Sequence, residues 1–368
     1  MNRLARRIRG LFMGGLGLFL LTGCWDQRAI DQRAIVLAIG VSADLHWTLL
    51  FPNVTVTASS ISSLGQSNEF YAITAKAKSY QKALHRVQLQ ANREVSMGDV
   101  QLVDLSASLS RSQLAGIMDS MILTGAIPAQ VWLAASQTSP STLLIHPSPQ
   151  TVVPVYYLSS YFDCHACHAA NFGVRAWQWW DRAVTPGVSP VLPVFTETPE
   201  GAAIYQILVY PVQGKPLLMP RQATQGYAYL MGKVKSGTQK VNCGGTTYMI
   251  SPIIDDANSR VRLTPTAVDV RIVIHARGEM ADMPAGLLIT RATERAVEQA
   301  TAARLVQLSR FAIHWANQTH TDPFGYAKRA AWLDNQTAAA ISPQALATLP
   351  IQAVIRAQVK LQGEGLAR

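Results

Sequence analysis

The last hundred residues carry the clearest alternation of apolar and polar positions. Apolar side chains stand at every second position over residues 268–274 and again over 351–361, which predicts two half-buried strands. Between them, helical spacing predicts one long helix over about 285–318. Together they predict an α+β unit in which the helix lies across the sheet. The residues expected on the buried stripe of this helix are Ile289, Ala292, Ala296, Ala300, Ala303, Val306 and Ile313.

Strand and helix patterns alternate through the first 145 residues. A continuous apolar run over 35–41 is typical of a strand buried on both faces. Helical spacing resumes after residue 110, with Ser110 as the expected N-cap. This alternation favours a layered sheet with helices packed on it. The expected strands cover 35–41, 47–57, 99–105 and 131–136, and the expected helices cover 79–91, 110–123 and 141–144.

The middle of the chain contains a proline-rich section and then a section with strand patterns. Prolines punctuate residues 146–200, which predicts mostly loop with short helical pieces, and the tryptophans at 177, 179 and 180 are expected to pack as core beneath these loops. A strand-rich section follows, with strands expected over 202–210, 227–234, 246–250 and 261–263, and a hairpin turn at Gln213-Gly214.

These patterns predict a multi-domain α+β protein with mixed sheets and packed helices. We expect an N-terminal α/β domain over 24–198, a smaller, mainly β domain over 199–263 and a C-terminal α+β domain over 264–368. The C-terminal domain contains the strand, long helix and strand described above.

Residues 1–23 form a separate leader. Four arginines precede an apolar run over 10–21, which is too short to span a bilayer and has the layout of an export signal. Leu21-Thr22-Gly23-Cys24 resembles the lipobox of bacterial lipoproteins. The resemblance implies that Cys24 is the lipid-attachment residue and becomes the mature N-terminus. The alternative is an ordinary signal peptide that contains a cysteine by chance.

The charge of the chain is basic but evenly spread. Removing the leader removes four arginines and no acidic residue, so the formal charge falls from +10 to +6. No Lys/Arg-rich block follows the leader, which argues against nucleic acid as a partner. The excess could attract anionic lipid headgroups. We expect instead that it mainly aids solubility.

Two stretches point to one family. Residues 24–30, Cys-Trp-Asp-Gln-Arg-Ala-Ile, followed by the apolar strand over 34–41, resemble the start of the Ger(x)C spore germination lipoproteins. Residues 317–326, which contain Asp322-Pro323-Phe324-Gly325, are similar to the family's segment after its long C-terminal helix. Trp332 and the closing strand also fit this resemblance.

The resemblance implies the C subunit of a nutrient-germinant receptor. Such a subunit is anchored by lipid to the outer face of the cell or spore inner membrane, and in this chain the resemblance implies that Cys24 carries the lipid. Its expected partners are the integral membrane subunits of the receptor and the lipid bilayer. Its expected role is to scaffold or couple nutrient sensing to germination, without catalysis, cofactor or metal.

Cys164-His165-Ala166-Cys167-His168 supports a different hypothesis. Cys-x-x-Cys-His is the attachment pattern of a c-type haem, in which both thiols form thioethers and the histidine ligates iron. An exported haem lipoprotein in electron transfer is therefore the alternative function. A disulfide between Cys164 and Cys167 is a comparable possibility in an exported protein. These residues crowd too closely for a zinc tetrahedron.

Other candidate residues point to no chemistry. Asp255-Asp256 is expected in a solvated turn rather than at a cation. Cys243 is expected to be a buried free thiol. No Gly-x-Ser-x-Gly or His-Glu-x-x-His pattern occurs, and the histidines at 275, 314 and 320 are too dispersed to indicate a site.

Overall fold

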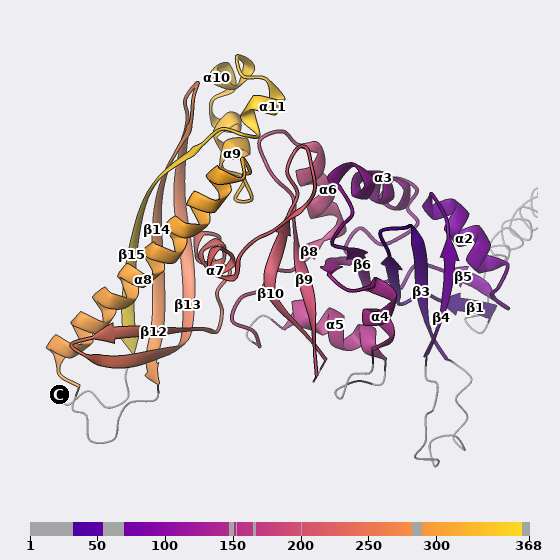
Figure 1. Ribbon diagram of the computed structural model, residues 1–368, viewed down its shortest axis with the longest axis horizontal. Coiled ribbons are helices and arrows are strands. Elements are labelled where there is room, and N and C mark those ends of the chain that lie inside the picture. The colour runs from indigo at the N-terminus through magenta and orange to yellow at the C-terminus, as the bar shows by residue number, and fades with distance from the viewer. Residues whose placement is uncertain are drawn as a thin grey trace, which may run out of the picture.

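The structure is a computed structural model that describes residues 32–53, 70–146, 151, 153–164, 167–199, 201–281 and 289–362. Figure 1 shows an elongated body with a β-sheet towards each end of its long axis. Within the described residues, nine strands form the larger sheet and four form the smaller one. The α+β class with mixed sheets and packed helices is therefore confirmed.

The larger sheet belongs to the N-terminal half and mixes parallel and antiparallel pairs. Its order is β11-β10-β9-β7-β6-β2-β3-β4, and β8 pairs with β7. The neighbours β2–β6, β6–β7 and β7–β9 are parallel, so the centre of the sheet needs helices on both faces. Its strands are β2 (Ala38–Val41), β3 (His46–Pro52), β4 (Phe70–Lys76), β6 (Leu102–Ser106), β7 (Trp132–Ser136), β8 (Val174–Arg175), β9 (Val191–Thr198), β10 (Gly201–Val209) and β11 (Leu217–Leu218); β1 (Arg33–Ile35) and β5 (Glu94–Ser96) pair separately.

Helices cover both faces of the larger sheet. One group comprises α2 (Tyr80–Gln88), α3 (Arg111–Ile122) and α6 (Ala176–Val184), and the other comprises α4 (Pro140–Ile145) and α5 (Pro154–Asp163). Each group lies over its own buried apolar cluster. Ser110 caps α3 as expected, because its hydroxyl accepts from the N–H of Gln113 while the Gln113 side chain accepts from the N–H of Ser110.

The smaller sheet has the order β12-β13-β14-β15. β14 and β15 are parallel neighbours, and α8 (Arg291–Gln318) connects them, which confirms the expected strand, long helix and strand. The inner face of the sheet packs against α7 (Arg221–Leu230), α8 and α9 (Tyr326–Leu333). Its strands are β12 (Gly237–Cys243), β13 (Thr246–Leu263), β14 (Val268–Ala281) and β15 (Ile351–Gln362), and the short helices α10 (Asn335–Ala339) and α11 (Pro343–Leu346) precede β15. Of the helices described, none is both long and apolar enough to cross a bilayer.

The buried stripe expected on α8 is confirmed at Ile313 and at Ile289 just before the helix, but it is wrong between them. Ala292 and Ala303 are exposed, whereas the buried positions run through Val297, Thr301 and Leu305. The reason is that α8 is packed on more than one side, by α7 and by both outer strands of the sheet, so small residues do not mark one core-facing stripe. The buried residues of α8 are Val297, Thr301, Leu305, Leu308, Ser309, Ala312, Ile313 and Ala316.

One further local prediction is wrong, and another is wrong in part. Residues 227–234 were expected as a strand, but α7 continues to Leu230. Except for Gln225, every residue of α7 from Ala223 onwards is buried, so no polar face reveals its helical period. Residues 146–200 were expected as mostly loop with short helical pieces. The helices α5 and α6 match the second part, but the section also contains β9, a strand inside the larger sheet that includes Pro193.

The strands of residues 199–263 are divided between the two sheets. β10 and β11 form the expected hairpin in the larger sheet, with Gly214 in its turn at a φ of 95°, while β12 and β13 belong to the smaller sheet. This section therefore has no sheet of its own, and the boundaries of independently folding domains stay a prediction. β3 ends at Pro52, and residues 54–57 of the strand expected over 47–57 lie outside the described residues.

Asp104 predicts a pH dependence of stability. It lies fully buried on β6, where one carboxylate oxygen accepts from Ser136 Oγ at 2.8 Å, and burial raises its pKa from 3.8 to about 7. Because the folded-state pKa is the higher one, this group's contribution is complete below pH 3.8 and is lost as pH rises through 7. The loss reaches about 4 kcal/mol of unfolding free energy. Urea unfolding between pH 4 and 8 should show a shallower decline for Asp104→Asn than for the wild type; equal slopes would contradict this assignment.

Candidate functional site at the junction of the two halves

The turn between α8 and α9 is organised by one buried carboxylate. Asp322 is 1% exposed, and its Oδ1 accepts from the N–H groups of Phe324 at 3.0 Å and Gly325 at 2.8 Å. Its Oδ2 accepts from the N–H of Ala327 at 2.7 Å, at the start of α9. Gly325 has a φ of 75°, which favours glycine. Asp322 therefore satisfies N–H groups that a helix start leaves unpaired.

The segment that follows α6 binds this turn. The N–H of Ser189 donates to the carbonyl of Asp322 at 2.8 Å, and the N–H of Asp322 donates back to Ser189 Oγ at 3.1 Å. The guanidinium of Arg182 donates to the carbonyls of both Ser189 and Pro323. Ser189 and Asp322 are 133 positions apart in the chain. These bonds join the N-terminal half directly to the turn after the long C-terminal helix.

A second layer of contacts supports this junction. Lys328 Nζ lies 2.7 Å from Asp181 Oδ2 in an ion pair, and the N–H of Lys328 donates to the carbonyl of Gly187 at 3.0 Å. Gly187 has a φ of 76°, and a Cβ there would lie 2.9 Å from the backbone nitrogen of Lys328. Glycine therefore permits both the turn and the close approach of α9.

Opposing effects act on the pKa of Asp322. Burial raises it to about 6, while the N–H groups of Ala327, Gly325 and Phe324 and the charge of Arg182 act to lower it. The carboxylate is therefore ionised near neutral pH and complements the guanidinium beside it. Because its oxygens accept from backbone N–H groups, this carboxylate positions the chain rather than a reacting molecule.

Aromatic rings pack through the junction in sequence. Phe172 stacks near Tyr227 with ring centroids 6.4 Å apart, and Tyr227 packs against Phe324 at 5.7 Å. Phe324 in turn stacks on Tyr326 at 5.1 Å. The rings come from the N-terminal half, from α7, from the turn before α9 and from the first residue of α9. They give the polar contacts of the junction a continuous apolar support.

A backbone bridge also connects the halves. Ala170 pairs with Val234, the N–H of Asn171 donates to the carbonyl of Lys233, and the N–H of Lys235 donates to the carbonyl of Ala169. Asp255 fixes the far side of this bridge because its Oδ1 accepts from the N–H of Val234 at 2.8 Å. The turn that we expected at Asp255-Asp256 is wrong, since both residues lie within β13 and Asp255 is buried.

Family comparisons cover both halves of the chain. Residues 26–197 match the family model described as the spore germination protein N-terminal domain, and residues 219–360 match the one described as spore germination B3/GerAC like, C-terminal. The chain belongs to the Ger(x)C family of spore germination proteins. This is the family of germinant-receptor C subunits, as the resemblance of its two end segments implied.

A solved structure supports the fold of this Ger(x)C protein. The crystal structure of the GerBC protein is similar with a TM-score of 0.55 over 88% of this chain and 96% of that chain. At 12% sequence identity, the likeness concerns the fold alone. No curated protein sequence matches the chain.

Cys164 and Cys167 are joined by a disulfide. Haem attachment would use both sulfurs as thioethers, so this pairing favours the disulfide over the haem hypothesis. His168 stacks on Tyr161 with centroids 3.4 Å apart, and burial lowers the pKa of His168. The imidazole is therefore neutral near pH 7 and packs against the neighbouring ring.

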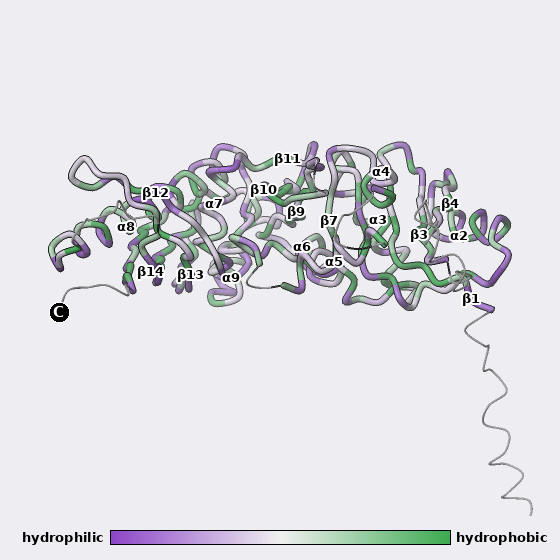
Figure 2. Tube along the Cα trace, turned by 90° about the horizontal axis from the view of Figure 1, so that it is seen from below, coloured by the Kyte–Doolittle hydropathy of each residue, from purple (hydrophilic) through white to green (hydrophobic). Residues whose placement is uncertain are grey.

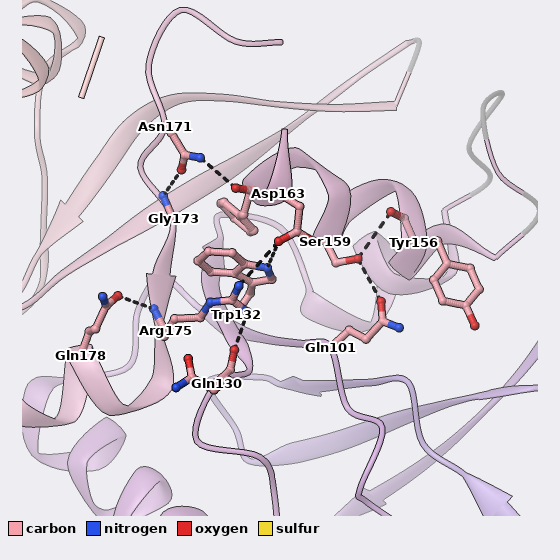
Figure 3. A network of polar contacts seen from close by, with 11 residues as sticks. Gln101, Gln130, Trp132, Tyr156, Ser159, Asp163, Asn171, Gly173, Arg175 and Gln178 are labelled. Carbon is pink, nitrogen blue, oxygen red and sulfur yellow. Dashed lines mark hydrogen bonds and ion pairs between the residues drawn. The ribbon is translucent and has the colours of Figure 1, made fainter. Parts of the chain in front are cut away.

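The chain on either side of the disulfide is fixed (Figure 3). Asp163 at the end of α5 accepts from the indole N–H of Trp132 at 3.2 Å and pairs with Arg175, which stacks over the same indole ring. Asn171 donates to the carbonyl of Phe162 at 2.8 Å. The disulfide therefore links the end of α5 to Cys167, two residues before the backbone bridge to the C-terminal half begins at Ala169.

A cavity of about 340 Å³ opens beside this bridge. Tyr161, His168 and Tyr205 line it from the N-terminal half, and Tyr229 and Gln239 line it from the C-terminal half. Its described lining contains aromatic rings, amides and a neutral histidine. The space suits small uncharged groups.

The other candidate residues are dispersed or lie outside the structure. Cys24 lies outside the described residues, so its lipidation stays a prediction. Cys243 is free but only half-buried at the end of β12, which corrects the expected burial. No cluster of three or more metal-ligating side chains occurs in the described ranges. Of the three tryptophans, Trp179 is buried, Trp180 is half-buried and donates to Asp119, and Trp177 is 44% exposed.

Sequence reasoning found one side of the junction and missed the other. The family resemblance singled out the segment containing Asp322, Phe324 and Gly325. Arg182, Gly187 and Ser189 lie in the proline-rich stretch that we interpreted as loop. No local sequence pattern indicates that Ser189 and Asp322 form hydrogen bonds with each other, because they lie 133 positions apart in the chain.

Proposed function

We propose that this protein is the lipid-anchored C subunit of a nutrient-germinant receptor, in which it couples nutrient sensing by integral membrane subunits to germination. The match of both halves to the family carries this proposal. Its role is scaffolding and coupling, without catalysis. In support, the carboxylate at the junction accepts hydrogen bonds from three backbone N–H groups, which is a structural role.

The junction suits a subunit that transmits a change. The Arg182, Ser189 and Asp322 bonds and the Lys328–Asp181 ion pair connect the halves at one place, and the bridge of residues 169–171 connects them at another. Because the two connections lie at different places, each one resists rotation of one half of the molecule about the other connection. A force or partner acting on one half would therefore move the other half with it.

The anchor confines this body to a surface. We propose that Cys24 carries the lipid and holds the protein on the outer face of the cell or spore inner membrane. Two acyl chains give firm attachment where one is marginal. Confinement raises the effective concentration of the subunit beside its membrane partners.

Replacing Cys24 tests the anchor and the function together. Cys24→Ala should move the protein from the membrane fraction to the soluble fraction and slow germination with nutrients, because the subunit would no longer be concentrated at the receptor. Fractionation of spores and the fall in optical density during germination measure the two effects. Cys243→Ala is the matched control, since it makes the same substitution at a cysteine that the structure shows to be free, without touching the proposed anchor. Wild-type germination by spores that carry Cys24→Ala would refute the proposed role.

A further inference from the structure

The outward face of β13, β14 and β15 is open. Side chains alternate along these strands, and the inward ones pack against α7, α8 and α9. The outward ones are exposed along most of the strand length. Figure 2 shows β13 and β14 along one long edge of the body, with α8 on their other side. Nothing in the described part of the chain covers this outward face.

Basic side chains dominate this face. It carries six Arg or Lys side chains against three carboxylates, those of Asp256, Asp269 and Glu279. In the parts of the chain that the structure describes, none of the six makes an ion pair. The six are Arg260, Arg262, Arg271, Arg277, Arg356 and Lys360.

The strand register sets like charges against each other at two places and one opposite pair, Arg262 and Asp269, at a third. Arg260 on β13 stands directly opposite Arg271 on β14, and Arg277 on β14 stands directly opposite Lys360 on β15. Like charges in directly opposed cross-strand positions destabilise a sheet. Neutral polar residues would satisfy the fold equally well at these exposed positions. The arrangement therefore indicates an anionic partner outside the chain.

Exposed aliphatic side chains lie among these charges. Ile254, which pairs with Arg277, is 51% exposed, and Val354, which pairs with Arg271, is 58% exposed. Basic residues mixed with apolar ones suit the headgroup region of a bilayer, where phosphates meet the start of the acyl chains. This composition favours a lipid surface over a purely acidic polypeptide.

The position of the face is consistent with a membrane. In Figure 2, β1 lies along the same edge as β13 and β14, at the opposite end of the body. β1 begins one residue after Gln32, where the described chain starts. A body held at its N-terminal end can therefore turn this edge towards one continuous surface.

We propose that the outward face of β13–β15 is a docking surface for anionic phospholipid headgroups, which lays the elongated body along the membrane. The orientation rests on the proposed lipid anchor, whereas the headgroup binding does not. This surface gives the basic excess of the chain a role beyond the solubility that we expected from the sequence. Each basic residue held near an anionic surface strengthens binding several-fold.

Vesicle sedimentation tests this surface. The mature chain, residues 24–368 produced without its lipid, is mixed with vesicles of phosphatidylcholine alone or of phosphatidylcholine with phosphatidylglycerol. The face variant carries Arg260→Gln, Arg271→Gln, Arg277→Gln and Lys360→Gln. The control variant loses the same charge at exposed positions elsewhere, through Lys82→Gln, Lys215→Gln, Arg295→Gln and Arg310→Gln.

The expected result is binding that requires phosphatidylglycerol, weakens with salt and falls at least about tenfold in the face variant but not in the control. The face variant should melt no lower than the wild type by circular dichroism, because two like-charge pairs are removed. Equal vesicle binding by both variants would overturn the proposal. So would a wild type that ignores these vesicles and binds polyglutamate through the same face, which would identify an acidic protein as partner. Since the chain carries no lipid here, such a failure leaves the Cys24 anchor and the receptor role intact.

Discussion

Gly226→Ala should destabilise the protein by about 3 kcal/mol, the upper end of the range for overpacked cores. Gly226 is the contact point at which α7 crosses α8. A Cβ at this position would fall far inside the van der Waals distance of the Leu308 carbonyl oxygen and 3.0 Å from the Cβ of Ala312. The first of these atoms is helix backbone, so it cannot turn away as a flexible side chain does. We expect α7 to be displaced from α8, which would also disturb Tyr227 in the aromatic packing of the junction.

Gly116→Ala is the matched control for this change. Gly116 is likewise a helical glycine, in α3, but an added Cβ meets nothing within 4 Å. Alanine should therefore stabilise the protein by up to about 1 kcal/mol through helix propensity. Urea unfolding of both variants measures the difference. Stabilisation by both substitutions would mean that α7 and α8 do not pack as closely as described.

Asp322→Ala should cost at least about 3 kcal/mol and loosen the junction. The N–H groups of Phe324, Gly325 and Ala327 lose their acceptor together, and each buried unpaired group costs about 1–3 kcal/mol. Hydrogen exchange should accelerate at these three amides and at Ser189, whose N–H donates to the carbonyl of Asp322. Nutrient germination should slow even though the proposed lipid-attachment residue, Cys24, is unchanged.

Two further variants test whether the effect of Asp322→Ala comes from the loss of this carboxylate. Asp322→Asn keeps one oxygen for Phe324 and Gly325, so its destabilisation should be smaller than that of Asp322→Ala. Asp334→Ala is a control, because Asp334 also caps a helix but its carboxylate accepts from Thr337 rather than from the turn that binds Ser189 and Arg182. Asp322→Ala with unchanged amide exchange at Ser189 would show that the turn does not hold the two halves together.

Helices and strands were predictable from the sequence where one face of the element is buried and the other is exposed to solvent. The strands around α8 alternate cleanly, and the outward positions of β15 are polar except for Val354. Prediction failed where that condition fails. α7 is buried almost all round, α8 is packed on more than one side, and Asp255 is a buried acid held within a strand by the N–H of Val234.

The candidate site was half predictable for a related reason. The segment from Asp322 to Gly325 was recognisable through its resemblance to the family, and the left-handed glycine and the capping carboxylate explain its residues locally. Its partners Arg182 and Ser189 depend on how two sheets are placed relative to each other. That placement arises from packing between residues far apart in the chain, which leaves no periodic trace in the sequence.

Affinity isolation from spore membranes tests the central claim most directly. The full chain with its own leader, tagged at the C-terminus, is captured after mild detergent extraction, and the co-isolated proteins are identified by mass spectrometry. We predict that two integral membrane proteins co-isolate with the wild type and with Gly116→Ala, and that their recovery falls with Asp322→Ala. A wild-type chain that is recovered intact from the membrane without integral membrane proteins would contradict the proposal that it serves as a subunit of a germinant receptor.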